Sequence, residues 1–229
     1  MGLMDSERLT VKLYVARTQP VDAPPPTAAP PAIAPPAIAP PAVAPRELVR
    51  IFHAWIQDDR LPHHLPIDVA DYSHVHRGPG IVLACHAGFF AFDAADGRPG
   101  LRYRRRRPAY DQAPLPDALR SLASACKLLQ EEPGVDLPFE TSELLLQVDD
   151  RLRTARPEAA LDALRGELAA LPEAVFGRGA RLRLEAAGSA GEPFAARLRI
   201  SGGTATAGWK TPCAPRPAAA VKPPADPPG

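Results

Sequence analysis

The sequence predicts an α+β (mixed α/β) domain with a mostly antiparallel sheet and about three helices on one face. Two observations lead to this fold class. Segments with alternating apolar residues and segments with helical periodicity are interspersed, in the order β-α-β-β-β-β-α-β-α-β-β, without strict alternation. Along the strands the apolar residues alternate cleanly with polar ones, so we expect one face of the sheet to be solvated.

Proline marks the limits of the domain. Of the 30 prolines in 229 residues, 11 fall between residues 20 and 45 and seven between 212 and 228. The repeated Ala-Pro-Pro-Ala-Ile unit favours extended polyproline II, which cannot build a core. The predicted organisation is an N-terminal core strand in residues 1–17, a Pro/Ala-rich low-complexity insert in 18–45, a globular α+β domain in 46–202 and a disordered Pro/Ala-rich tail in 203–229.

The first half of the chain predicts one helix and five strands. Residues 10–16 are apolar and β-branched, which is typical of a strand. Residues 46–58 repeat apolar side chains at helical spacing, and Pro62 lies beyond the end of this helix. Four further strands follow, with a hairpin turn at Asp96–Gly100 between the last two; they cover residues 65–69, 81–86, 89–93 and 101–107.

The second half predicts two helices and three strands. Asp117 is a good N-cap for a helix that ends before Pro133. Residues 144–148 alternate as a strand, and Pro157 suits the first turn of the third helix. The last two strands, 180–186 and 194–200, are expected to pair as a hairpin.

Charge and cysteine content limit the class of protein. Residues 46–202 carry a net charge of −1, which disfavours a strongly basic nucleic-acid binder. The three cysteines are an odd number without a C-x-x-C pair, which is typical of a reducing cytosol, so we expect a cytoplasmic protein. An apolar signal region and an apolar run near membrane-spanning length are both missing, so no membrane association is expected.

All six histidines lie between residues 53 and 86. Imidazole is a common metal ligand and an acid–base group near neutral pH. If His74 and His76 lie on a strand, their spacing places both rings on one face. One hypothesis is therefore a divalent metal ion held by Asp71, His74, His76 and His86. Another is an acid–base site without metal, with Asp68, Asp71, His74 and His86 as the candidate catalytic residues.

The alternative for the same residues is that they are ordinary polar groups on loops and strand faces, and this interpretation is favoured. The sequence has no H-E-x-x-H motif and no nucleotide-binding or serine-hydrolase loop. His53 lies off the apolar stripe of its helix and is expected to be solvated. Gly78-Pro79-Gly80 predicts a tight turn, and Cys85 shares the phase of Ile81 and is expected to be a buried small hydrophobe.

Arginine recurs out of phase with the apolar residues of three strands. If these strands share one sheet, their arginines lie together on its solvated face and form a candidate surface for an anionic partner, either nucleic acid or an acidic protein. The alternative is a solvated face that resists aggregation. The candidate residues are Arg102, Arg104, Arg106, Arg181, Arg183, Arg197 and Arg199.

The stretch IDVADYSHVHRGPGIVLACHAGFFAFDAADGRPGLRYRRRRP, together with the preceding FHAWI and the following LLLQVDDRL, resembles a family of uncharacterised bacterial proteins found in cyanobacteria among others. The resemblance covers residues 9–17 and 46–200 and implies no transferable function. The residues that match its pattern best are Asp68, Asp71, Tyr72, His74 and His86. Members have His-Glu where this chain has His86-Ala87 and often lack a histidine at position 76, which speaks against a metal site that depends on these positions.

These observations favour a non-enzymatic binding or regulatory domain that acts through residues 68–86 and the neighbouring hairpin. Two alternatives remain open at this point. One is a small metal-dependent or His/Asp-assisted enzyme, which requires Asp71, His74 and His86 to converge. The other is an adaptor that binds nucleic acid or an acidic protein through the arginine-rich face.

Overall fold

The computed structural model describes residues 8–16, 43–61, 63–106, 114–149, 157–169, 179–187 and 193–202. The elements follow the predicted order: β1 (Leu9–Val15), α1 (Pro45–Gln57), β2 (Pro66–Tyr72), β3 (Gly80–Cys85), β4 (Gly88–Asp93), β5 (Gly100–Arg105), α2 (Pro114–Glu131), β6 (Phe139–Val148), α3 (Pro157–Ala169), β7 (Arg181–Ala187) and β8 (Phe194–Ser201). Nearly all of the predicted insert and the whole predicted tail lie outside the described residues.

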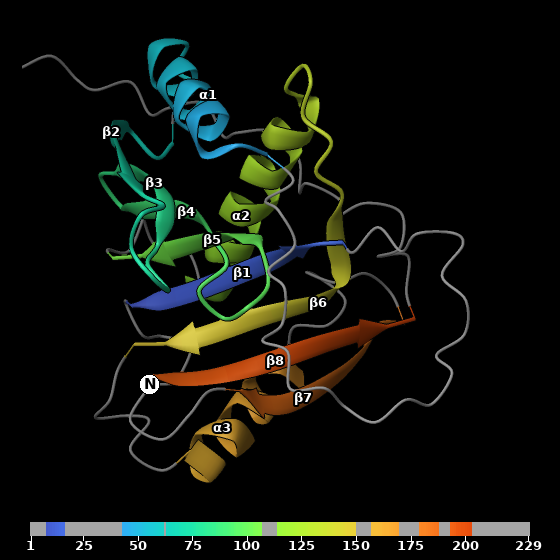
Figure 1. Ribbon diagram of the computed structural model, residues 1–229. Coiled ribbons are helices and arrows are strands. Elements are labelled where there is room, and N and C mark those ends of the chain that lie inside the picture. The colour runs from blue at the N-terminus through green and yellow to red at the C-terminus, as the bar shows by residue number, and fades with distance from the viewer. Residues whose placement is uncertain are drawn as a thin grey trace, which may run out of the picture.

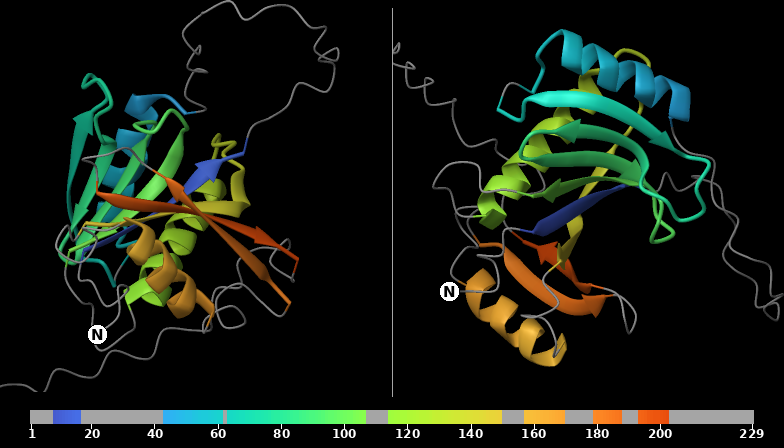
Figure 2. Two further views of the ribbon diagram at one scale, coloured as in Figure 1. Left: turned by 90° about the horizontal axis from the view of Figure 1, so that it is seen from below. Right: turned by 90° about the vertical axis from the view of Figure 1, so that its left-hand side faces the viewer.

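The strands form one eight-stranded sheet in the order β2-β3-β4-β5-β1-β6-β8-β7, and each neighbouring pair is antiparallel. The N-terminal strand β1 lies in the middle, between β5 and β6, and all seven of its residues are buried. The hairpins β2 to β5 lie on one side of it, and β6, β8 and β7 on the other (Figure 1). The sheet is strongly twisted, with β2 and β7 as its opposite edges (Figure 2).

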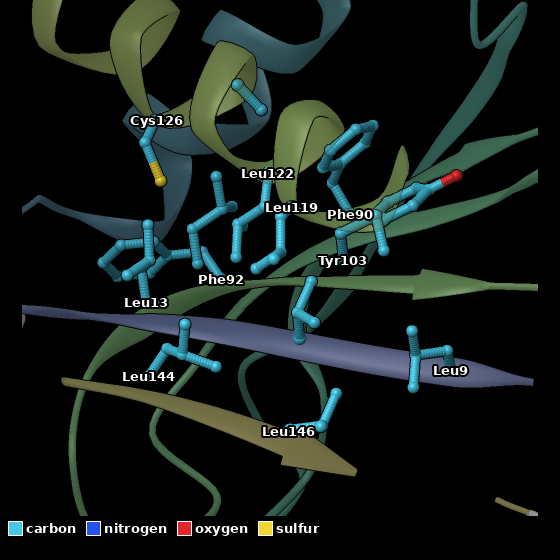
Figure 3. Close-up of a cluster of buried hydrophobic side chains, with 14 of the residues drawn as sticks. Leu9, Leu13, Phe90, Phe92, Tyr103, Leu119, Leu122, Cys126, Leu144 and Leu146 are labelled. Atoms are coloured by element: carbon cyan, nitrogen blue, oxygen red, sulfur yellow. The ribbon is translucent and has the colours of Figure 1, made fainter. Parts of the chain in front are cut away.

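The core lies between the sheet and the helices. Helix α1 packs on β2 and β3, α2 on β1 and β5, and α3 on β7 and β8. Apolar residues from all three helices join one buried cluster with every second residue of the strands, and Figure 3 shows its centre, where Leu13, Leu122 and Phe92 meet beneath α2. The helical stripe of α1 predicted this packing, since Leu48, Ile51, Phe52 and Trp55 are its buried residues.

Some of the predicted boundaries are wrong. Helix α2 begins at Pro114, so Asp117 lies in its first turn and is not its N-cap; a proline suits the first helical position, where its missing N–H needs no partner. Strand β6 begins at Phe139, because its backbone pairs with Val15 before the apolar alternation starts.

The second face of the sheet is less solvated than the alternation predicts. Thr10, Lys12 and Tyr14 of β1 point to this face and are 2%, 0% and 0% exposed. Tyr14 packs in a small apolar cluster with Leu145 and Ala195. The turn between β4 and β5 supplies Asp96, which binds both Lys12 and Tyr14 from above. A central strand therefore has both faces covered.

None of the helices in the described ranges combines the length and apolar character needed to cross a membrane.

Candidate functional site

The four residues of the predicted metal site do not come together. His74 and His76 lie in the turn between β2 and β3, not on a strand, so their spacing does not align their rings. His86 follows β3 at the opposite end of the same hairpin, where Cys85 pairs with Pro66. A six-residue strand separates the two ends by roughly 20 Å. Within the described ranges, no three His, Cys, Asp or Glu side chains gather closely enough to hold a metal ion.

The two candidate carboxylates have local backbone roles. Asp71 Oδ1 accepts a hydrogen bond from the Ser73 N–H at 2.8 Å, which fixes the start of the turn. Hydrogen bonds from Ser73, with a smaller contribution from His74, lower the pKa of Asp71. Asp68 Oδ1 accepts the N–H of its neighbour Val69 at 2.8 Å. The structure gives neither carboxylate a histidine partner of the kind that acid–base catalysis needs.

The interpretation of Cys85 is confirmed, whereas the turn predicted at Gly78-Pro79-Gly80 lies just before this segment, at residues 73–77. Cys85 is 6% exposed, and burial raises its pKa to about 12, which keeps it as an unreactive thiol. The Gly78-Pro79-Gly80 segment leads from the turn into β3. Gly80 has a positive φ of 67°, and a Cβ there would lie 2.0 Å from the carbonyl oxygen of Phe92. This glycine is therefore required for close approach of β4, not for a ligand.

An exposed apolar patch runs along β2. The sequence predicts that Leu65 and Ile67 alternate inward with Val69, but they are 61% and 65% exposed. Leu65 lies outside β2, just before Pro66, and has a positive φ of 47°. Ile67 lies in a register shift between Pro66 and Asp68, a bulge that turns its side chain outward. Tyr72 and Val75 are also exposed, at 43% and 44%. Together with Leu65 and Ile67 they are the exposed large hydrophobic residues of the described ranges. We call these four residues the β2 edge patch.

The opposite edge of the sheet has a different character. On β7, Arg181 and Arg183 are exposed and Glu185 is more than one-third exposed at its side chain, whereas Leu182 and Leu184 are half-buried against the core. Charged residues at an edge strand discourage pairing with another chain. The β2 edge also carries charges, at Asp68 and Asp71, but it combines them with exposed large apolar side chains, which β7 does not have.

The predicted arginines do share one face. Arg102 pairs across the sheet with Lys12, Arg104 with Thr10, and Arg183 with Arg199, which places them opposite to the core-facing residues. Arg106 lies over the ring of Phe89 on this face, at 5.4 Å from its centroid.

Most of these arginines are paired with carboxylates. Arg102 contacts Asp93 at 3.1 Å and Arg104 contacts Asp149 at 2.9 Å. Glu143 forms ion pairs with Arg197 at 3.1 Å and with Arg199 at 3.7 Å, and it also binds Arg98. Glu185 lies within 3.7 Å of both Arg183 and Arg199. The face is therefore a network of mixed charge, which attracts an anionic partner far less than seven unpaired arginines would.

Sequence reasoning missed the polar residues that are most deeply buried. Lys12, Arg105 and Asp93 have side chains that are 0–1% exposed. Lys12 interrupts an otherwise apolar strand, and this break in the pattern was the signal that could have identified it. His64 was also missed: it packs edge-on against Phe90 and Tyr103, and burial lowers its pKa to about 4.

A scan against protein-family models finds no match for the sequence, and a search of curated proteins finds none either. The resemblance to a bacterial family stays a prediction.

Proposed function

We propose that this protein is a non-enzymatic binding domain that docks an extended segment of a partner protein along the outer edge of β2. The observation that carries the proposal is the β2 edge patch. Its four large apolar side chains lie within an 11-residue stretch, Leu65 to Val75, at the edge of the sheet. Contiguous exposed apolar residues are typical of interaction sites.

An edge strand is suited to this kind of docking. Among the described residues, β2 pairs with β3 alone, so its other edge can accept a strand from a second protein. In such strand addition, backbone hydrogen bonds supply affinity and alternate side chains supply specificity. Helix α1 packs behind β2 and β3, which holds the edge in a fixed position.

The charges on β2 indicate the chemistry of the partner. Asp68 and Asp71 are exposed on the strand and have no cationic side chain bonded to them among the described residues. Asp68 pairs with Ala84 and Asp71 pairs with Ile81, so the two carboxylates point to opposite faces of the sheet. A partner strand that alternates apolar and basic residues places its basic side chains on the face of one of them. Opposite charges directly across neighbouring strands stabilise strand pairing, and like charges destabilise it. The proposed partner is therefore an extended segment that alternates apolar and basic residues.

The geometry gives less support to the two alternatives. An enzyme built on Asp71, His74 and His86 needs these groups within reach of one substrate, and the hairpin separates them. An adaptor that binds nucleic acid through arginines needs unpaired cations, and five of the seven candidates have carboxylate partners.

A peptide-binding experiment on the full chain tests the proposal. The probes are a short synthetic peptide of alternating valine and lysine, its valine–glutamate counterpart, and an N-methylated valine–lysine peptide that cannot complete a strand ladder. We expect the lysine peptide to bind about fivefold more tightly than the glutamate peptide. We expect N-methylation to abolish binding, and the bound lysine peptide to slow hydrogen exchange at β2 amides.

Ile67→Lys is the decisive variant, because Ile67 is 65% exposed and its replacement leaves the core intact. It should abolish peptide binding, whereas Arg181→Lys on the opposite edge should have no effect. Peptide binding that is unchanged in Ile67→Lys would overturn the proposal. Binding that favours the glutamate peptide and falls steeply with salt would assign the interaction to the arginine face instead. Self-association that Ile67→Lys abolishes would make a second copy the occupant.

A further inference from the structure

A group of polar side chains is buried on the core side of the sheet, where β5 ends beneath the first turn of α2. Arg105, the last residue of β5, has a side chain that is 1% exposed. Tyr103 of the same strand is fully buried. His64, from the turn before β2, packs against Tyr103 with ring centroids 5.3 Å apart. Asp117 of α2 has Oδ2 at 3.6 Å from Arg105 Nε. We call these four residues the β5–α2 polar cluster.

The cluster has an excess of unsatisfied hydrogen-bonding groups. None of the three guanidinium nitrogens of Arg105 donates a hydrogen bond to a described residue. At 3.6 Å the contact with Asp117 is an ion pair, too long for a hydrogen bond. His64 Nδ1 and Asp117 Oδ2 also lack a partner there. The Tyr103 hydroxyl has no hydrogen bond of good geometry, although the Ser121 side chain lies close to it. Buried polar atoms are nearly always satisfied, so four such neighbours point to a ligand that they share.

The composition of the cluster indicates the charge of that ligand. Arg105 offers five N–H donors in a planar fork, which matches two oxygens of a carboxylate or phosphate. The Tyr103 hydroxyl is a further donor, and it is turned away from Cys126 and the apolar centre of the core (Figure 3). The N-terminus of the 18-residue helix α2 adds a positive partial charge at the same place.

We propose that the β5–α2 polar cluster binds a small oxyanion, with the guanidinium of Arg105 as its bidentate partner and the Tyr103 hydroxyl as an additional donor. The chemistry that defines the ligand is a carboxylate or a phosphate-type group. The cluster reaches solvent at His64, which is half-buried, and at Asp117, whose side chain is 15% exposed. Two of its four residues therefore lie near the surface. A cation is excluded by the same guanidinium.

Asp117 couples this binding to protons. Its carboxylate is the one anionic group that faces Arg105 among the described residues, so an incoming oxyanion competes with it. Burial raises the pKa of Asp117, against the opposing effect of Arg105 and Arg120. When Asp117 takes up a proton from solvent, it ceases to repel the anion and becomes a donor. Binding should therefore tighten as the pH falls.

The other titratable groups beside the cluster keep their charge near neutral pH. Burial holds His64 neutral, with a pKa of about 4, and keeps Cys85 as a thiol, with a pKa of about 12. Burial and the nearby Asp117 raise the pKa of Tyr103, so its hydroxyl stays protonated. Proton uptake on binding is thus expected at Asp117.

The test is a titration of the full chain with phosphate, sulfate and acetate. Chloride at equal ionic strength is the reference for each of them, and calorimetry and thermal unfolding measure the binding. We expect at least one oxyanion to bind and to raise Tm, whereas chloride does not. Preference for phosphate and sulfate identifies a tetrahedral ligand, and preference for acetate identifies a carboxylate. Affinity should increase as the pH is lowered.

Two variants locate the site. Tyr103→Phe removes one hydroxyl and should weaken binding about fivefold, the usual effect of one hydrogen bond. Arg105→Met should abolish it. Tyr14→Phe is the matched control, because it removes a buried hydroxyl on the opposite face, bonded to Asp96 at 2.8 Å. Equal responses to oxyanions and chloride would overturn the proposal. Binding that survives in Tyr103→Phe at full strength would do the same, even if Arg105→Met does not fold.

Discussion

Lys12 Nζ and Asp93 Oδ1 lie 3.0 Å apart with both side chains fully buried, although 81 residues separate them in the sequence. Lys12 also donates to Asp96 at 2.6 Å and to the carbonyl oxygen of Arg98 at 2.9 Å. The three donors of the ammonium are thus all used. This contact fastens the turn between β4 and β5 to the central strand and closes the second face of the sheet.

Lys12→Met should destabilise the protein strongly. The change leaves buried carboxylates without their cation, and breaking a buried pair from one side typically costs about 3–5 kcal/mol of unfolding free energy. Urea unfolding at pH 7 measures the loss. The control is Arg50→Met, which breaks an exposed pair with Glu47 and should change stability little. Equal unfolding midpoints for the two variants would show that the buried pair is not what holds the turn.

Asp96→Asn should lower stability at neutral pH and matter less in acid. Burial acts to raise the pKa of Asp96, but the charge of Lys12 and hydrogen bonds from Lys12 and Tyr14 outweigh it, so the pKa is lowered. A carboxylate whose pKa is lowered by folding stabilises the protein at pH values above its unfolded pKa of about 4. This stabilisation is lost as the pH falls through the pKa of the folded state. We expect the unfolding free energy of Asp96→Asn to be about 1–3 kcal/mol lower than that of the wild type at pH 7, and this difference should shrink below about pH 4. A constant deficit from pH 7 to pH 2.5 would refute this reasoning.

Gly80→Ala should cost more than Gly97→Ala, although both glycines have positive φ. At Gly80, φ is 67° and a Cβ would lie 2.0 Å from a backbone oxygen of β4, which has no room to move. At Gly97, φ is 82° and nothing lies within 4 Å of the added atom. We expect Gly97→Ala to lower the unfolding free energy by about 1–2 kcal/mol, from backbone strain alone. Gly80→Ala should lower it by clearly more. Chemical denaturation of both variants under one condition decides between them.

The sequence predicted the parts of the fold that depend on periodicity. The stripe through Leu48 and Trp55 identified α1, and the alternation around Leu101 and Tyr103 correctly placed Arg102 on the other face. Periodicity could not reveal which face is covered, because Asp96, in the turn that covers Lys12, is 84 residues away in the sequence.

The candidate site was harder to predict. The histidines are close in the sequence but not in space, because His74 and His86 lie at opposite ends of the β2–β3 hairpin. The β2 edge patch depends on a one-residue bulge after Pro66, which reverses the direction of Ile67 without altering the apolar pattern. The β5–α2 polar cluster joins residues from three separate segments, and single-sequence patterns carry no information about such contacts.

His64→Phe should remove the loss of stability between pH 7 and pH 5. Burial between Phe90 and Tyr103 lowers the pKa of His64 from 6.5 to about 4, so the unfolded chain takes up a proton in this range and the folded chain does not. Stability therefore falls as the pH drops through 6.5, by about 2 kcal/mol at pH 5. Phenylalanine keeps the ring packing and has no proton to bind, so the variant should lack this loss of stability over the same range. His53→Phe is the control, because His53 is exposed on α1 and does not contribute to the lowered pKa of His64, and it should keep the wild-type slope. Urea unfolding at half-unit steps of pH measures all three proteins, and parallel slopes for wild type and His64→Phe would show that His64 is not the buried group that titrates.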